Sequence, residues 1–185
     1  MSTGRLFVAI GIAALAAGSA LFVLMRPVPR VPPARVEAPE ISPSAVLAAS
    51  FEDGSGRSRS LAEFQGKVLV VNFWATWCAP CRAEMPAFDR LSDRWAERGV
   101  RFVGLSAEPQ ELAAGFGKTL GIRYPLWTSS GDVVPELSRR LGNRLGVLPH
   151  TVVLDGSGRV VAQRVGPYTE AEVDRLLGEI SGKKS

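Results

Sequence analysis

The two cysteines of this 185-residue sequence stand three positions apart, in the segment NFWATWCAPCRAEMP (72–86). At this spacing the sulfurs of Cys78 and Cys81 can form and break a bond with little movement of the backbone. A disulfide that closes so short a loop stabilises the fold very little, because the entropic benefit grows with loop length. The spacing therefore favours a redox-active disulfide, Cys78–Cys81, over a static staple.

The sequence around the pair predicts a strand followed by a helix. KVLVVNFW (67–74) is a nearly continuous apolar run, typical of a strand buried on both faces. A helix is expected to begin near Cys78, where free backbone N–H groups and the helix dipole stabilise a thiolate. We therefore expect Cys78 to attack a substrate disulfide and the more buried Cys81 to resolve the mixed disulfide. The core face of the helix is expected to carry Met85, Phe88, Leu91 and Trp95.

The rest of the chain alternates strands and helices. A helix opened by Thr169 and Glu172 is expected at the C-terminal end, and Asp132 is expected to cap another. This alternation predicts an α/β sandwich with a mixed sheet. Strands are expected within 45–64 around a Gly/Ser turn, at 100–107 and 124–127, and in a hairpin over 151–163; helices are expected within 108–122 and 132–143.

The N-terminal part predicts a membrane anchor and a linker. Residues 6–25 are 20 positions without a charge, about the length of a membrane-spanning helix. A cleaved signal peptide is the alternative, but the apolar run continues beyond the small residues at 18–20. Residues 26–44 hold six of the 13 prolines and predict an extended spacer. The expected parts are an anchor (1–25), a Pro-rich linker (26–44) and a globular α/β domain (45–185).

Composition excludes several other classes of function. The net charge of +4 is mild, and no cluster of Lys and Arg interleaved with aromatics indicates nucleic-acid binding. The single histidine, His150, leaves no spacing of ligands that would form a zinc site. We expect neither a metal nor a cofactor.

The segment FWATWCAPCRAEMP (73–86) resembles the active site of thioredoxin-fold proteins, and most of all the membrane-tethered TlpA-like and ResA-like thiol-disulfide oxidoreductases of bacteria. GVLPHTVVLDGSGRVVAQRVG (146–166) is similar to their cis-proline loop and the hairpin that follows it. The resemblance implies a cis bond at Pro149, backbone hydrogen bonds from Leu148 to a substrate strand, and a close approach by Gly166. Trp77 is expected to be a partly exposed contact surface.

Asn72 departs from the buried aspartate of ordinary thioredoxins and cannot accept a proton. Glu84, one helical turn beyond Cys81, matches the glutamate that ResA-like proteins keep near their active site. A carboxyl buried there would have a raised pKa and could serve as acid or base. The alternative is a solvated glutamate paired with an arginine.

The resemblance favours an extracytoplasmic reductase of protein disulfides that receives electrons from an integral-membrane thiol transporter. Cytochrome c maturation and copper-site assembly are the implied destinations. The expected location is the bacterial inner membrane, single-pass, with the catalytic domain facing the periplasm. The alternative is a copper chaperone using Cys78, Cys81 and His150, although such proteins space their cysteines more widely. Otherwise His150 is expected to flank the substrate groove. The substrate, the electron donor, the net direction and the oligomeric state stay open.

Overall fold

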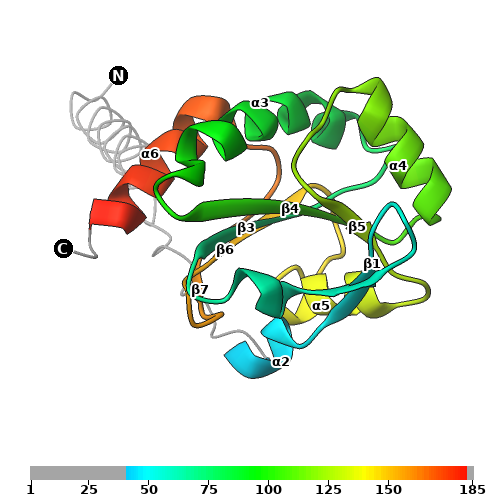
Figure 1. Cartoon of the computed structure of the whole chain (residues 1–185), viewed down its shortest axis with the longest axis horizontal. Helices are drawn as coiled ribbons and strands as arrows, with labels where there is room; N and C mark the ends of the chain where they lie inside the picture. Colours follow the sequence, from blue (N-terminus) through cyan, green and yellow to red (C-terminus); the bar gives the residue numbers. More distant parts are fainter. Residues whose placement is uncertain (1–40, 183–185) are drawn as a thin grey trace, which may run out of the picture. The chain divides into compact units, whose positions relative to one another are not determined.

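A seven-stranded mixed sheet forms the middle layer of residues 41–182, the part of the chain that this computed structural model describes (Figure 1). Its strands are β1 (Ser50–Glu52), β2 (Ser58–Ser60), β3 (Val68–Phe73), β4 (Val100–Ser106), β5 (Leu126–Thr128), β6 (His150–Leu154) and β7 (Val160–Val165). They lie in the order β2-β1-β5-β4-β3-β6-β7. β3 pairs parallel with β4 and antiparallel with β6, so the predicted mixed sheet is confirmed.

Strand β3 is buried along its whole length, as its apolar run predicts. Because side chains alternate between the two faces of a strand, its residues divide into two sets. Leu69, Val71 and Phe73 belong to one core cluster. Val68 and Val70 belong to the cluster on the opposite face, and this alternation directs Asn72 toward that second face as well.

Helices cover both faces of the sheet (Figure 1). One face carries α3 (Ala79–Ala96), α4 (Gln110–Thr119) and α6 (Glu170–Gly182); the other carries α2 (Pro43–Leu47), the 3-10 helix η1 (Leu61–Phe64) and α5 (Val133–Arg140). The predicted apolar face of α3 is confirmed, because Met85, Phe88, Leu91 and Trp95 are all buried. Phe88, Leu91 and Trp95 pack with Val68 and Val70 of β3, which fixes the start of α3 above the end of that strand.

The two expected helix caps have different outcomes. At α6, the Thr169 N–H and hydroxyl each donate to Glu172 Oε2 at 2.8 Å, and the Glu172 N–H donates to Thr169 Oγ1 at 3.3 Å, which confirms the capping pair. At α5, Asp132 is the residue before the helix but makes no capping hydrogen bond with its side chain. Its backbone (φ −94°, ψ 7°) is not extended, and a capping side chain reaches the next turn from an extended backbone. The expected side-chain cap by Asp132 is therefore wrong.

The packed domain begins inside the segment expected to be linker. Ser42 caps α2, its hydroxyl accepting from the Ala45 N–H at 3.3 Å, and Ile41 packs against the core. The predicted anchor (1–25) and residues 26–40 of the linker lie outside the described residues. Within 41–182, none of the helices has the length and apolar character needed to span a bilayer.

Gly104 on β4 leaves room for the ring of Trp74. A Cβ at this position would lie 2.6 Å from Leu126 Cδ2 and 3.0 Å from Trp74 Nε1. We expect Gly104→Ala to lower the free energy of unfolding by about 1–3 kcal/mol, as overpacking does, in urea titrations. Gly115→Ala is the matched control, because no atom lies within 4 Å of its added Cβ. It should stabilise helix α4 by about 0.5–1 kcal/mol, and equal effects of the two changes would contradict this account.

Candidate active site

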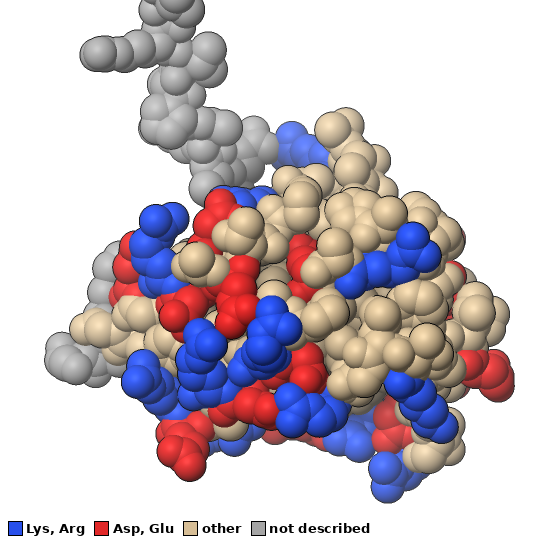
Figure 2. Space-filling view, turned by 90° about the horizontal axis from the view of Figure 1, so that it is seen from above, with Lys and Arg blue, Asp and Glu red and all other residues tan. Residues whose placement is uncertain are grey.

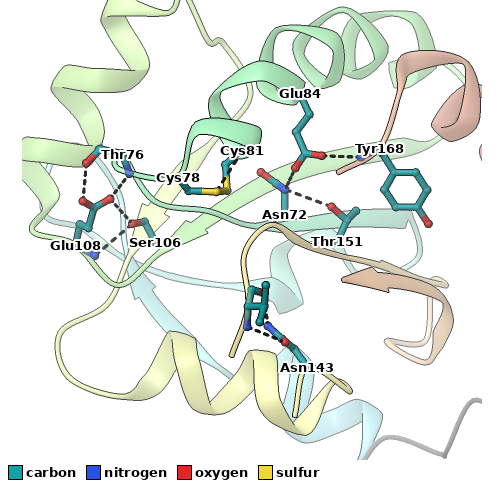
Figure 3. Close-up of a disulfide and its surroundings, with 11 residues drawn as sticks. Asn72, Thr76, Cys78, Cys81, Glu84, Ser106, Glu108, Asn143, Thr151 and Tyr168 are labelled. Atoms are coloured by element: carbon teal, nitrogen blue, oxygen red, sulfur yellow. Dashed lines mark hydrogen bonds between the residues drawn. A yellow bond between two sulfur atoms is a disulfide. The ribbon is translucent and has the colours of Figure 1, made fainter. Parts of the chain in front are cut away.

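The two cysteines form a disulfide at the start of α3 (Figure 3). Cys78 is the residue before the helix, and its Sγ accepts a hydrogen bond from the Cys81 N–H at 3.3 Å. Cys78 keeps a small exposed area (4%), whereas Cys81 has none. The expected order of burial is therefore confirmed, and Cys78 lies at the helix end where N–H groups stabilise negative charge.

The two tryptophans of the motif have opposite surroundings, as expected. Trp74 is 2% exposed and packs in one cluster with Cys78, Cys81 and Met85. Trp77 is 71% exposed beside the disulfide. A large apolar side chain left in solvent next to a reactive bond is a surface that another molecule can cover.

Glu108 fastens the loop that carries Trp77. Its carboxylate accepts hydrogen bonds from the Thr76 N–H and hydroxyl, both at 2.6 Å, and from the Ser106 hydroxyl at 3.3 Å (Figure 3). Charge-assisted hydrogen bonds of this kind are stronger than neutral ones. The side chain therefore joins the end of β4 to the residue two positions before Cys78, a contact that the sequence did not indicate.

Glu84 is buried, 3% exposed, one turn beyond Cys81. Its Oε1 accepts from Asn72 Nδ2 and its Oε2 from the Tyr168 N–H, each at 2.9 Å (Figure 3). Burial raises the pKa of the Glu84 carboxyl to about 7, against the opposing effect of the hydrogen bonds from Tyr168 and Asn72. The surroundings match the expected acid/base group, and the alternative of a solvated glutamate is wrong.

The Leu148–Pro149 peptide bond is cis, as the resemblance implied. Leu148 is half-buried and Pro149 is buried. The Gly166 N–H donates to the Pro149 carbonyl at 2.8 Å, so the expected approach of a second loop at Gly166 is present.

His150 is fully buried, although we expected it to flank the substrate groove. Its Nδ1 lies 2.9 Å from Ser138 Oγ, its Nε2 lies 3.3 Å from Gln163 Oε1, and its ring stacks on Phe73. Burial lowers the pKa of His150 to about 4, the Gln163 contact opposing this, so the ring is neutral near pH 7. Both ring nitrogens are engaged inside the fold, which removes the histidine on which the copper-chaperone alternative depended. No group of three potential metal ligands occurs within residues 41–182.

A mostly apolar cavity of about 330 Å³ opens beside the disulfide. Trp77 and Leu148 line it together with Glu108. Val134 and Pro135 of α5 complete the wall, and sequence reasoning missed them. The exposed Leu145 (85%) and Val147 (48%) stand in the loop before Pro149. The apolar side chains of Leu145, Val147 and Leu148 in one loop were the sequence signal that could have indicated an apolar surface here.

The raised pKa of Glu84 makes a prediction for stability against pH. A carboxyl whose pKa is raised by folding stabilises the fold most below its ordinary pKa of 4.5, and this contribution is lost as the pH rises through about 7. The free energy of unfolding of the wild type, minus that of Glu84→Gln, should therefore fall by roughly 3 kcal/mol between these limits. Urea titrations across this range measure the difference, and a constant difference would contradict the raised pKa.

Known thiol-disulfide oxidoreductases resemble this chain over most of its length. Residues 34–177 match the family model described as Redoxin. The thiol-disulfide oxidoreductase ResA of Bacillus anthracis is 30% identical over 131 residues, covering 70% of this chain and 72% of the relative. ResA of Halalkalibacterium halodurans is 31% identical over 129 residues, covering 69% and 70%.

Solved structures share the architecture. A thiol:disulfide interchange protein of the thioredoxin family from Chlorobium tepidum TLS has a TM-score of 0.61 and 36% identity, covering 74% of this chain and 96% of its own. StoA from Bacillus subtilis, at 22% identity and a TM-score of 0.55, shares the fold over 68% of this chain and 92% of its own. The chain belongs to the Redoxin family and is a thioredoxin-fold thiol-disulfide oxidoreductase of the ResA type.

Proposed function

We propose that this oxidoreductase reduces protein disulfides outside the cytoplasm while anchored to the membrane by residues 1–25. The observation that carries the proposal is the Cys78–Cys81 pair at the start of α3 with the buried carboxyl of Glu84 behind it. Proteins outside the cytoplasm are kept oxidised, so a tethered dithiol there serves as a dedicated reductant.

In the proposed reaction the Cys78 thiolate attacks one sulfur of the substrate disulfide. The substrate S–S bond breaks, a Cys78–substrate disulfide forms, and the released thiolate takes a proton. Cys81 then loses its proton to the carboxylate of Glu84 and attacks the Cys78 sulfur. The Cys78–Cys81 bond forms and the second substrate thiol leaves, so two electrons have passed from the protein to the substrate.

Three residues are proposed to hold the substrate beside the disulfide. Trp77 offers an exposed ring, and the backbone of Leu148 offers hydrogen bonds to an extended segment. Pro149, in its cis form, presents that backbone at the site. The cavity lined by Trp77 and Leu148 adjoins this position.

The proposed location and partners rest on the N-terminal sequence and on the chemistry of the cysteine pair. Residues 6–25 have the length of a transmembrane helix. Arg5 on one side is opposed by three arginines within 26–35 on the other, so the N-terminus is placed inside the cell mainly because a redox-active cysteine pair is expected outside. The oxidised pair would be reduced again by an integral-membrane thiol carrier, and cytochrome c maturation or copper-site assembly would use the product. The proposed location is the bacterial inner membrane, with a single pass and the catalytic domain facing the periplasm.

Cys81→Ser in the full chain should trap the substrate. Without Cys81 nothing resolves the mixed disulfide, so Cys78 should remain bonded to its partner, detected on non-reducing gels and identified by mass spectrometry. If the domain faces outward, a membrane-impermeant thiol reagent should label Cys78 of this variant in intact cells once a mild reductant has released the bonded partner. Cys78→Ser is the matched control and should trap nothing, since Cys81 is fully buried. Equal trapping by both variants, or none by Cys81→Ser, would contradict the proposal.

Glu84→Gln should slow disulfide exchange by about 10-fold or more, because the group that takes the proton from Cys81 is lost. The rate of exchange with a disulfide-bonded peptide should also lose its dependence on an ionisation near pH 7, the pKa of Glu84. Glu97→Gln, an exposed change beyond the last turn of the same helix, is the control. If both variants keep the wild-type pH–rate profile, Glu84 has no role in the reaction.

A further inference from the structure

Asn72 carries a buried oxygen that lacks a partner. The side chain is 1% exposed, and its Nδ2 donates to Glu84 Oε1 at 2.9 Å and to Thr151 Oγ1 at 3.3 Å. No donor within the described residues reaches Oδ1. An acceptor left unbonded in a protein interior is destabilising and uncommon, so this atom calls for a functional explanation.

The position of Asn72 on β3 directs this oxygen toward the disulfide. Val70, two residues earlier on the same face, packs under Phe88 in the middle of α3, while Trp74, two residues later, packs with Cys78 and Cys81. Asn72 therefore lies under the turn of α3 that contains Cys81 and Glu84. Figure 3 shows its side chain between Glu84 and the disulfide, with the oxygen on the side of Cys81.

The two hydrogen bonds of Asn72 Nδ2 give the orientation of the amide. The nitrogen faces Glu84 Oε1 and Thr151 Oγ1, and whenever Glu84 is ionised its carboxylate can only accept from this nitrogen. The oxygen of a planar amide points away from its nitrogen, here toward the preceding turn of the helix. A neutral amide can donate to Glu84 and accept from another group at the same time, which an aspartate could not do.

Reduction of the disulfide creates the missing donor. The S–S bond breaks on addition of two electrons and two protons, and the fully buried Cys81 becomes a thiol with an S–H group. We propose that Asn72 Oδ1 accepts a hydrogen bond from this thiol in the reduced protein, and so favours the reduced state and keeps Cys81 protonated until it attacks the mixed disulfide. This assignment rests on the proposed function and makes Asn72 a positioning residue for the resolving step.

The reduction potential tests the assignment. Asn72→Leu removes the acceptor, which destabilises the reduced state, and removes the unbonded oxygen, which stabilises the disulfide. Both effects act in the same direction, so the equilibrium constant for reduction by dithiothreitol should fall about 10-fold, equivalent to about 30 mV. Thr151→Val is the matched control, because it removes the other partner of Asn72 Nδ2 and leaves Oδ1 in place. Thr151→Val should leave the equilibrium constant for reduction by dithiothreitol within about twofold of the wild-type value.

A spectroscopic measurement separates this role from a structural one. In Cys78→Ser the only thiol of the chain is Cys81, and a hydrogen-bonded S–H stretching band lies at lower infrared frequency than a free one. The band should be shifted down in this variant and return upward when Asn72→Leu is added. The Cys78→Ser spectrum alone decides the matter if Asn72→Leu does not fold.

Three results would each overturn the assignment. They are an unshifted S–H band in Cys78→Ser, an Asn72→Leu protein that cycles at the wild-type potential, and a Thr151→Val protein whose potential shifts as far as that of Asn72→Leu. A wild-type pair that dithiothreitol cannot reduce would instead overturn the proposed function itself, so the two failures are distinguishable.

Discussion

The alternation of side chains along β3, a strand packed on both faces, determines which residues lie beneath the disulfide. Leu69, Val71 and Phe73 anchor the strand in one core, and Val68 and Val70 anchor it in the other. A shift of one residue would exchange the two sets and bury the wrong groups, so the register is strongly fixed. Asn72 and Trp74 follow in the same alternation. The polar and aromatic side chains beneath the disulfide are therefore positioned by the packing of the apolar residues earlier in the same strand.

The same constraint positions two buried ionisable groups, His150 and Glu84. His150 lies on β6, which pairs with β3, and Glu84 is hydrogen-bonded to Asn72 of β3. Phe73 is opposite His150, and Asn72 is opposite Thr151. The lowered pKa of His150, about 4, means that its contribution to stability is complete above its ordinary pKa of 6.5 and is lost as the pH falls toward about 4. The pKa of Glu84 is raised to about 7, so its contribution to stability is complete below its ordinary pKa of 4.5 and is lost as the pH rises through about 7. Between about pH 4 and about pH 7 both His150 and Glu84 are neutral, and a neutral side chain costs less to bury than a charged one.

Sequence reasoning succeeded where local pattern is sufficient. The apolar run of β3, the spacing of Phe88 and Leu91, and the Thr169–Glu172 cap each carry their signal within a few residues. It failed where the residues that contact a side chain are far away in the sequence. Nothing near His150 indicates that Ser138 and Gln163 enclose it, and the bond from Tyr168 to Glu84 spans 84 residues. The cis bond at Pro149 followed from the resemblance rather than from physics, since trans is the general expectation. The anchor over 1–25 stays a prediction.

The contrast between the buried Trp74 and the exposed Trp77 has a practical consequence. Both indoles lie next to the sulfurs, Trp74 in the same packed cluster and Trp77 as the neighbour of Cys78 in the chain. A disulfide quenches the fluorescence of an adjacent indole, and its opening relieves the quenching. The intrinsic tryptophan fluorescence of the protein should therefore report whether the Cys78–Cys81 bond is open or closed.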